Sequence, residues 1–126
     1  MKKIYIADDN QQNFEALQRV LAEVVPDCEV AYAPGGHAIV SLVDNQKPDL
    51  ILMDISMPGM DGIEATAWIR KKYTKRELPI IAMTGRDAPD DQQQVFDAGC
   101  NEYLTKPFSV SQLMEKVGFY LGGSAS

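Results

Sequence analysis

The stretch Leu50-Ile51-Leu52-Met53-Asp54 decides how this sequence folds. Four consecutive apolar residues that end in a carboxylate are typical of a strand buried on both faces, with a polar group at its end. The segment 55–62 contains one proline and two glycines, which predicts a loop. Asp61 and Glu64 then have the spacing of a capping box, so we expect a helix to begin there.

Strand-like and helix-like segments alternate in the same way along the rest of the chain. The expected strands are Lys3–Ala7, Glu29–Ala33, Leu50–Met53, Pro79–Met83 and Glu102–Thr105. Four expected helices begin near Asn10, Gly35, Asp61 and Pro89. A fifth carries the apolar stripe Val110, Leu113, Met114, Val117 and Leu121. Five strand–helix units predict an α/β domain, with a parallel sheet covered by helices on both faces.

The composition is that of an ordinary globular protein with one domain. The chain has 126 residues, of which 45% are hydrophobic, and no apolar run reaches the roughly 18 residues of a membrane span. We expect residues 1–121 to form the domain and 122–126 (Gly-Gly-Ser-Ala-Ser) to be a flexible tail. The N-terminus turns acidic at Asp8, which does not suit a secretory signal.

The charge and the cysteines limit the partners and the compartment. The net charge of −6 and the lack of a Lys/Arg stripe argue against direct nucleic-acid binding. Cys28 and Cys100 are isolated, lack the spacing of metal ligands and suit the reducing cytoplasm. Neither a disulfide between them nor insertion into a membrane is expected.

Polar residues stand at the expected carboxyl ends of four strands. Asp8 and Asp9 follow the first strand, Asp54 the third and Thr84 the fourth, and Lys106 comes after the fifth. Ligands of open parallel sheets bind at this edge, so we expect these side chains to converge. Carboxylates brought together need a counter-charge, and oxygen ligands suit Mg²⁺, which also accepts a phosphate oxygen.

This arrangement predicts phosphoryl chemistry at Asp54. A carboxylate can attack phosphorus and form an acyl phosphate, and such transfer depends on positioning and on neutralising the phosphoryl oxygens. Mg²⁺, the Lys106 ammonium and the Thr84 hydroxyl are the groups available for that purpose. Taken singly, Asp8-Asp9 would be explained by helix capping and Lys106 by a solvated surface position.

The segment from Leu52 to Gly62 (LMDISMPGMDG) resembles the phosphorylation loop of response-regulator receiver domains. The acidic pair Asp8-Asp9, the Thr84 after IIAM and the segment from Tyr103 to Phe108 (YLTKPF) match that family in order and spacing. The resemblance covers residues 2–121. It implies the flavodoxin-like (βα)5 fold of chemotaxis regulators, with the sheet in the order 2-1-3-4-5.

The resemblance also implies roles for single residues. Asp54 would accept the phosphoryl group from a histidine kinase or a histidine phosphotransfer protein, in a cytoplasmic phosphorelay. Mg²⁺ would be held by Asp9, by Asp8 through water, by Asp54 and by the backbone carbonyl of Ser56. Lys106 would contact the phosphoryl group ahead of a cis Pro107.

The resemblance further implies how the signal leaves the domain. Thr84 and Tyr103 would form a coupled switch, and effectors would bind the face made by the fourth helix, the fifth strand and the fifth helix. Such a domain is not an enzyme acting on other substrates, although it assists its own phosphorylation and dephosphorylation. Ser56 and Arg86 stand at variable positions that resemble the family's tuners of the phosphate lifetime. Gly85 replaces the usual alanine and would add backbone freedom to the loop that moves on switching.

Three other functions compete with a stand-alone switch. The segment 61–70 resembles the receivers of hybrid histidine kinases, so the alternative is that the chain is one module of a larger protein, although Met1 just before the first strand favours a natural start. An aspartyl-phosphate hydrolase would need a second Asp where Ser56 stands. A receiver that only binds partners is disfavoured, because all the expected site residues are present.

Two conspicuous side chains are assigned to the surface. His37 lies near the start of the second helix, where a plain surface position is preferred over a phosphodonor role. Trp68 lies on the third helix beside a basic segment; packing against its own helix is preferred, and a partner anchor is the alternative. The basic segment 71–76 is interpreted as a solvated loop, with kinase docking as the alternative.

Overall fold

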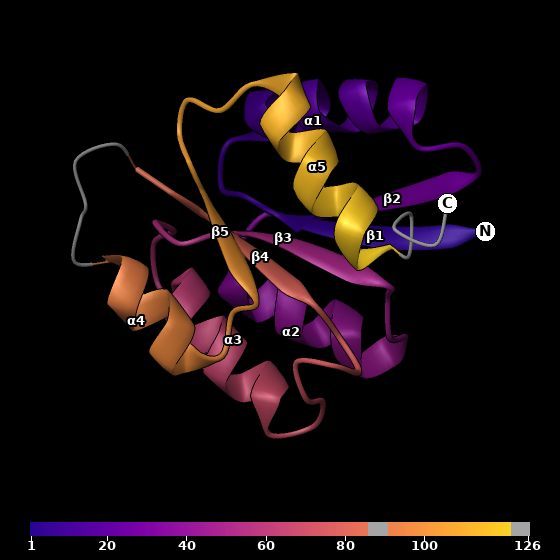
Figure 1. Ribbon diagram of the computed structural model, residues 1–126. Coiled ribbons are helices and arrows are strands. Elements are labelled where there is room, and N and C mark those ends of the chain that lie inside the picture. The colour runs from indigo at the N-terminus through magenta and orange to yellow at the C-terminus, as the bar shows by residue number, and fades with distance from the viewer. Residues whose placement is uncertain (86–90, 122–126) are drawn as a thin grey trace.

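The computed structural model describes residues 1–85 and 91–121 and contains one five-stranded parallel sheet (Figure 1). The strands are β1 (Lys2–Ala7), β2 (Cys28–Ala33), β3 (Leu50–Asp54), β4 (Ile80–Thr84) and β5 (Glu102–Thr105). Their order in the sheet is β2-β1-β3-β4-β5, and every neighbouring pair is parallel. The predicted fold class and strand order are therefore confirmed.

Helices cover both faces of the sheet. They are α1 (Gln11–Val24), α2 (Gly36–Asn45), α3 (Gly62–Arg70), α4 (Asp91–Ala98) and α5 (Val110–Tyr120). Figure 1 shows α1 and α5 on one face and α2, α3 and α4 on the other. Among residues 1–85 and 91–121, none of the helices has both the length and the apolar character that crossing a membrane requires.

Alternate residues of each inner strand pack into two separate hydrophobic cores, one on each face of the sheet. Ile4 and Ile6 of β1 pack with α1 and α5, whereas Tyr5 and Ala7 pack with the helices of the other face. The same division holds for β3, whose five residues are all buried. Because successive side chains of a strand point to opposite faces, a continuous apolar run is what a sheet covered on both sides requires.

Local signals fix where the helices begin. The Asn10 side chain accepts hydrogen bonds from the N–H groups of Gln12 and Asn13, and Asp61 forms the predicted capping box with Glu64. Ser109 and Gln112 form a second capping box at the start of α5. Each such cap satisfies N–H groups that the helix itself leaves without acceptors.

Some expectations changed or lie outside the described residues. Val110 was expected in the apolar stripe of α5, but it is 51% exposed, because it occupies the first helical turn, beyond the edge of the core. The expected first turn of the fourth helix at Pro89, the position of Arg86 and the tail 122–126 all lie outside the described residues.

The strand register brings four strand ends to one edge of the sheet. Ala7 of β1 is paired with Met53, and Asp54 of β3 is paired with Met83. Thr84 is in turn paired with Thr105 at the end of β5. The residues that follow Ala7 and Thr105 therefore lie along the same edge as Asp54 and Thr84.

Candidate functional site

Asp54 is the last residue of β3, and its side chain is nearly buried, with 5% of the residue exposed. The loop after it is tied to the sheet, because the Ile55 N–H donates to the Met83 carbonyl oxygen. The Ser56 N–H donates to Oδ1 of Asp54 over 3.1 Å, which orients the carboxylate. Ser56 itself is exposed. The local chain thus presents one fixed carboxylate at the mouth of a buried strand.

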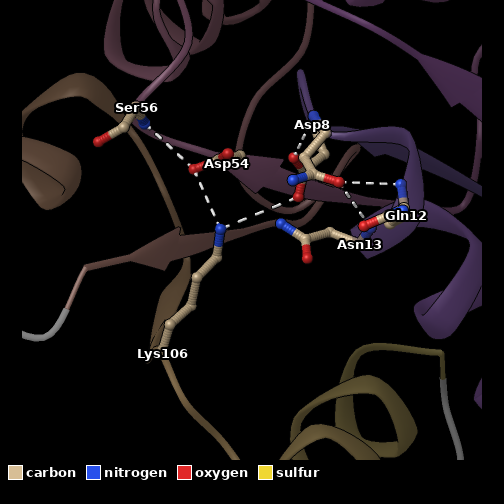
Figure 2. A network of polar contacts seen from close by, with 7 residues as sticks. Asp8, Gln12, Asn13, Asp54, Ser56 and Lys106 are labelled. Atoms are coloured by element: carbon tan, nitrogen blue, oxygen red, sulfur yellow. Dashed lines mark hydrogen bonds and ion pairs between the residues drawn. The ribbon is translucent and has the colours of Figure 1, made fainter.

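Lys106 reaches across the strand ends to two carboxylates (Figure 2). Its Nζ lies 3.5 Å from Oδ1 of Asp54 and 3.9 Å from Oδ2 of Asp8. The backbone of Lys106 is anchored by a 2.8 Å hydrogen bond from its N–H to the Thr84 carbonyl oxygen. The Lys106-Pro107 peptide bond is cis, as expected.

The three predicted acidic residues form one cluster. Carboxylate oxygens of Asp8, Asp9 and Asp54 lie within 4.8 Å of one another. Asp8 is fully buried, and its Oδ1 accepts a 2.8 Å hydrogen bond from the N–H of Asn10. Among the described residues, Oδ2 of Asp8 is a buried oxygen with no hydrogen-bond donor. Its nearest cation, the Lys106 ammonium, is 3.9 Å away, and a buried carboxylate oxygen without a hydrogen bond is costly, so this oxygen suits a place where a metal cation binds.

The electrostatics of the cluster raise the pKa of Asp54 from 3.8 to about 6. Burial is the largest cause, because it penalises the charged carboxylate. Lys106 opposes this effect and lowers the pKa, as does the hydrogen bond from Ser56, whereas Asp8 and Asp9 raise it. Asp54 is thus ionised at neutral pH but held in surroundings that favour added positive charge.

The two expected switch residues lie in different surroundings. Thr84 is 2% exposed at the end of β4, one residue beyond Met83, the strand partner of Asp54. Tyr103 is half-buried on β5, two residues before the strand end, where it is paired with Ala82. Its ring meets that of Phe96 of α4 edge-to-face, with the centroids 5.7 Å apart. Thr84 therefore borders the acidic cluster, whereas Tyr103 lies between β5 and α4.

A cavity beside the cluster is lined in part by Asn13, which the sequence did not single out. It has a volume of about 330 Å³, and its lining includes Asp8 and Lys106 together with Asn13 and Phe108. Figure 2 shows the Asn13 side chain extending from α1 on the side of Lys106. Asn13 lies on the first turn of α1, shortly after the acidic pair and the helix cap Asn10. This position in the sequence is the feature that could have marked it as part of the site.

Among the described residues, neither the cysteines nor His37 belongs to the acidic cluster. Cys28 and Cys100 are both free thiols, and burial raises the pKa of each. His37 is exposed on α2, in the surface position that was predicted for it. Met53 and Met57 are buried in the core on the side of α2 and α3, whereas the buried Met83 lines the cavity beside Asp8 and Lys106.

The sequence resembles one family over almost its whole length. The family model described as the response regulator receiver domain matches residues 4–118. The chain is 35% identical to the polar-differentiation response regulator DivK of Brucella anthropi, over 96% of this chain and 97% of that protein. It is 37% identical to the sensor protein GacS of Pseudomonas syringae over 91% of this chain, which spans only 13% of GacS.

Solved structures of receiver domains have the same fold as this chain. The crystal structure of the receiver domain of sensor histidine kinase PA1611 from Pseudomonas aeruginosa, with a magnesium ion coordinated in its active-site cleft, superimposes with a TM-score of 0.86. The two chains are 31% identical, and the match covers 96% of this chain and 98% of the other. The structural similarity therefore covers nearly all of both chains.

Proposed function

This chain belongs to the family of response regulator receiver domains, and we propose that Asp54 is the residue on which it accepts a phosphoryl group. The donor is a phosphohistidine of a histidine kinase or of a histidine phosphotransfer protein. Phosphorylation then changes the conformation of the domain and controls the binding of a partner in a phosphorelay.

One observation carries the proposal: Asp54 is a nearly buried carboxylate whose oxygen lies 3.5 Å from the Lys106 ammonium and beside two further carboxylates. A carboxylate kept only for stability would not be placed where burial, and to a lesser extent two neighbouring carboxylates, raise its pKa to about 6. Such placement suits a nucleophile whose product carries additional negative charge, because the cation and the metal ligands are already in position.

Asp8, Asp9 and Asp54 fit a magnesium ion. Their oxygens lie within 4.8 Å of one another, and Oδ2 of Asp8 is buried without a donor. All are hard oxygen ligands, and few enough to leave room for water and phosphate, as Mg²⁺ prefers. We assign the backbone carbonyl of Ser56 as a further ligand. When bound, Mg²⁺ supplies positive charge to the phosphoryl oxygens.

The transfer step follows from the positions of the protein groups. An oxygen of the ionised Asp54 attacks phosphorus in line, a carboxylate O–P bond forms, and the N–P bond to the donor histidine breaks. The electron pair of that bond returns to the imidazole, which takes up a proton. Lys106 pairs with one phosphoryl oxygen as a point charge, and the Thr84 hydroxyl donates to another.

The domain also assists the removal of its phosphate. In this step water attacks phosphorus, the Asp54 O–P bond breaks, and inorganic phosphate leaves. Ser56 is exposed two residues after Asp54, so we expect its side chain to border the path of the water, and Gly85, exposed directly after Thr84, leaves this side of the path without a side chain. Arg86, the other residue expected to tune this rate, lies outside the described residues.

The output of the switch is proposed for the face formed by α4, β5 and α5. When the Thr84 hydroxyl moves toward the phosphoryl group, it leaves space near β4, and the Tyr103 ring turns inward to fill it. Tyr103 is half-buried against Phe96 of α4, so its movement changes the surface that α4 and β5 present. An effector that binds this face would distinguish the two states.

Phosphorylation is tested by mass spectrometry after the chain is incubated with acetyl phosphate and Mg²⁺. We expect one phosphate adduct, its loss in Asp54→Asn and its loss when EDTA replaces Mg²⁺. The matched control is Asp44→Asn, an exposed carboxylate of α2, which should keep the adduct. No adduct with any donor, or an adduct that survives in Asp54→Asn, would overturn the proposal.

A second candidate is the same activity within a longer protein. The chain spans 97% of DivK but 13% of GacS, so relatives occur both as separate domains and as parts of sensor proteins. In the longer protein, the donor would be a histidine of the same polypeptide. The length of the open reading frame distinguishes the two forms.

A cytoplasmic location is part of the proposal. Phosphohistidine donors of this kind are made from ATP, which is a cytoplasmic reactant. Cys28 and Cys100 are free thiols, which persist in a reducing compartment.

A further inference from the structure

Five basic and aromatic residues gather at the ends of α2 and α3, away from Asp54. We call Lys47, Trp68, Lys71, Lys72 and Tyr73 the basic-aromatic patch. α3 starts directly after the Asp54 loop and runs back toward the start of β4, where Arg70 contacts Gly99 and Asn101. The patch therefore lies near the edge where the strands begin, opposite the phosphorylation edge (Figure 1).

Trp68 is the centre of this surface. It is the only tryptophan of the chain, and 52% of it is exposed. The Lys71 ammonium lies 4.1 Å from the centre of its ring, in the geometry of a cation–π contact. Trp68 is thus neither packed into a core nor left as an isolated apolar side chain, because a cation holds one part of its ring.

Tyr73 forms a second ring with cations around it. The ammonium groups of Lys72 and Lys47 lie 5.6 Å and 6.0 Å from its ring centre. Tyr73 is half-buried and packs against the core on the side of α2 and α3, so the ring is held in place. The two rings position three ammonium groups at one end of these helices.

The charge of the patch is poorly balanced by neighbouring acids. Asp44 lies 3.8 Å from Lys72. Glu77 accepts a hydrogen bond from the Thr74 N–H and is close enough to Lys47 for that cation to contribute, after Thr74, to its lowered pKa. In the described part of the chain, Lys71 has no carboxylate within ion-pair distance. Lys75 and Arg76, which follow in sequence, are also exposed. A chain of net charge −6 thus carries a local excess of positive charge here.

We propose that the basic-aromatic patch binds an acidic segment of a partner protein. Carboxylates of the segment pair with Lys71 and Lys72, and its backbone or an apolar side chain covers the exposed face of Trp68. Aromatic residues with a cation beside them are frequent anchors of interfaces, because they combine a large contact area with charge recognition. Solvated lysines alone would not explain why the half-exposed tryptophan lies among them.

The net charge favours a peptide over a longer polyanion. A nucleic acid or an anionic membrane would extend beyond the patch and meet the acidic remainder of the surface. A short acidic segment needs only the area of the patch. Because this surface and Asp54 lie at opposite edges of the sheet, binding here leaves phosphotransfer unobstructed, and the inference goes beyond the proposed function.

Trp68 allows a direct test with the full chain. Its fluorescence is measured while an aromatic-free peptide of about eight residues, rich in Glu and Asp, is added at low ionic strength. We expect a saturable change in emission that weakens as salt is raised, because exposed ion pairs are screened. In the double variant Lys71→Gln/Lys72→Gln, binding should be about tenfold weaker. The matched control Lys2→Gln/Arg19→Gln removes two exposed charges elsewhere and should bind normally.

The outcomes separate this inference from the proposed function. Asp54→Asn should bind the peptide as the wild type does, and Lys71→Gln/Lys72→Gln should still form the phosphate adduct. No saturable change in Trp68 emission, or equal weakening in both double variants, overturns the inference while phosphorylation at Asp54 stands. Tighter binding of duplex DNA or of phosphatidylserine vesicles than of the acidic peptide also overturns it, because the partner would then belong to another class.

Discussion

At the scale of single residues, Asp54 is where stability and function conflict. Burial and two neighbouring carboxylates raise its pKa to about 6, although Lys106 acts in the opposite direction. The folded protein therefore holds the Asp54 proton more tightly than the unfolded chain does. The free energy of unfolding should fall as the pH rises from 3.8 through about 6, and it stays lower above that range.

The first prediction is that Asp54→Asn stabilises the metal-free protein at neutral pH. Removal of the charge should raise the free energy of unfolding by about 2 kcal/mol at pH 7 in EDTA, and by much less at pH 4, where Asp54 is largely protonated in the folded state. Urea unfolding at the two pH values measures the difference. Glu23→Gln, which alters an exposed carboxylate of α1, should change stability little at either pH.

The second prediction concerns Lys106, the largest of the influences that lower the pKa of Asp54. In Lys106→Met, the pKa of Asp54 should rise further, by about one unit, because the nearby cation is lost. Carbon-13 NMR titration of the Asp54 carboxyl group measures this value directly in metal-free buffer. Lys116→Met removes an ammonium paired with Glu102 instead, and should leave the Asp54 pKa unchanged. An unchanged pKa in Lys106→Met would mean that the ion pair is not formed in solution.

At the scale of elements, Arg70 joins the end of α3 to the connection between α4 and β5. Its guanidinium donates to the carbonyl oxygens of Gly99, Tyr73 and Thr74 and to the side-chain oxygen of Asn101. Gly99 has a φ of +115°, and a Cβ added there would meet Cγ of Arg70 at 2.7 Å. The junction thus depends on a glycine and an arginine far apart in sequence.

The third prediction compares two glycine substitutions. Gly99→Ala should lower the free energy of unfolding by about 2 kcal/mol, because alanine is strained at this φ and its methyl group displaces Arg70. Gly118→Ala lies within α5 with open space around the added Cβ, and should raise stability by up to about 1 kcal/mol. Chemical denaturation of both variants measures the two effects. Equal effects would show that neither the positive φ of Gly99 nor its contact with Arg70 opposes a side chain at this position.

The same junction shows what the sequence could and could not predict. The end of α4 at Gly99 and the capping box of Asp61 were predictable, because both depend on neighbouring residues. The convergence of strand ends was predictable from the alternation of elements. Arg70 could not be assigned, because its partners are 29 and 31 residues away and no local pattern marks them. Trp68 was expected to pack partly against its own helix, and Lys71, the C-cap residue of α3, lies against its ring while half of Trp68 stays exposed.

At the scale of the whole molecule, one sheet divides two cores and carries the site at its edge. β1, β3 and β4 contribute side chains to both cores, so neither can lose its packing without exposing the other. We therefore expect unfolding in a single transition, as for most domains of this size. A ligand bound at the strand ends then stabilises the complete domain rather than one loop.

The fourth prediction follows from this coupling. Mg²⁺ at about ten times its Kd should raise the free energy of unfolding by about 1.4 kcal/mol, because the ion binds the folded state alone. Since Oδ2 of Asp8 is buried without a donor, Asp8→Asn should lose most of this gain while it unfolds in the same single transition. Urea unfolding monitored by Trp68 fluorescence and by circular dichroism, with NaCl at matched ionic strength as the control, measures both. Two separate transitions would contradict the coupling of the cores, and an equal gain in Asp8→Asn would exclude this carboxylate from the metal site.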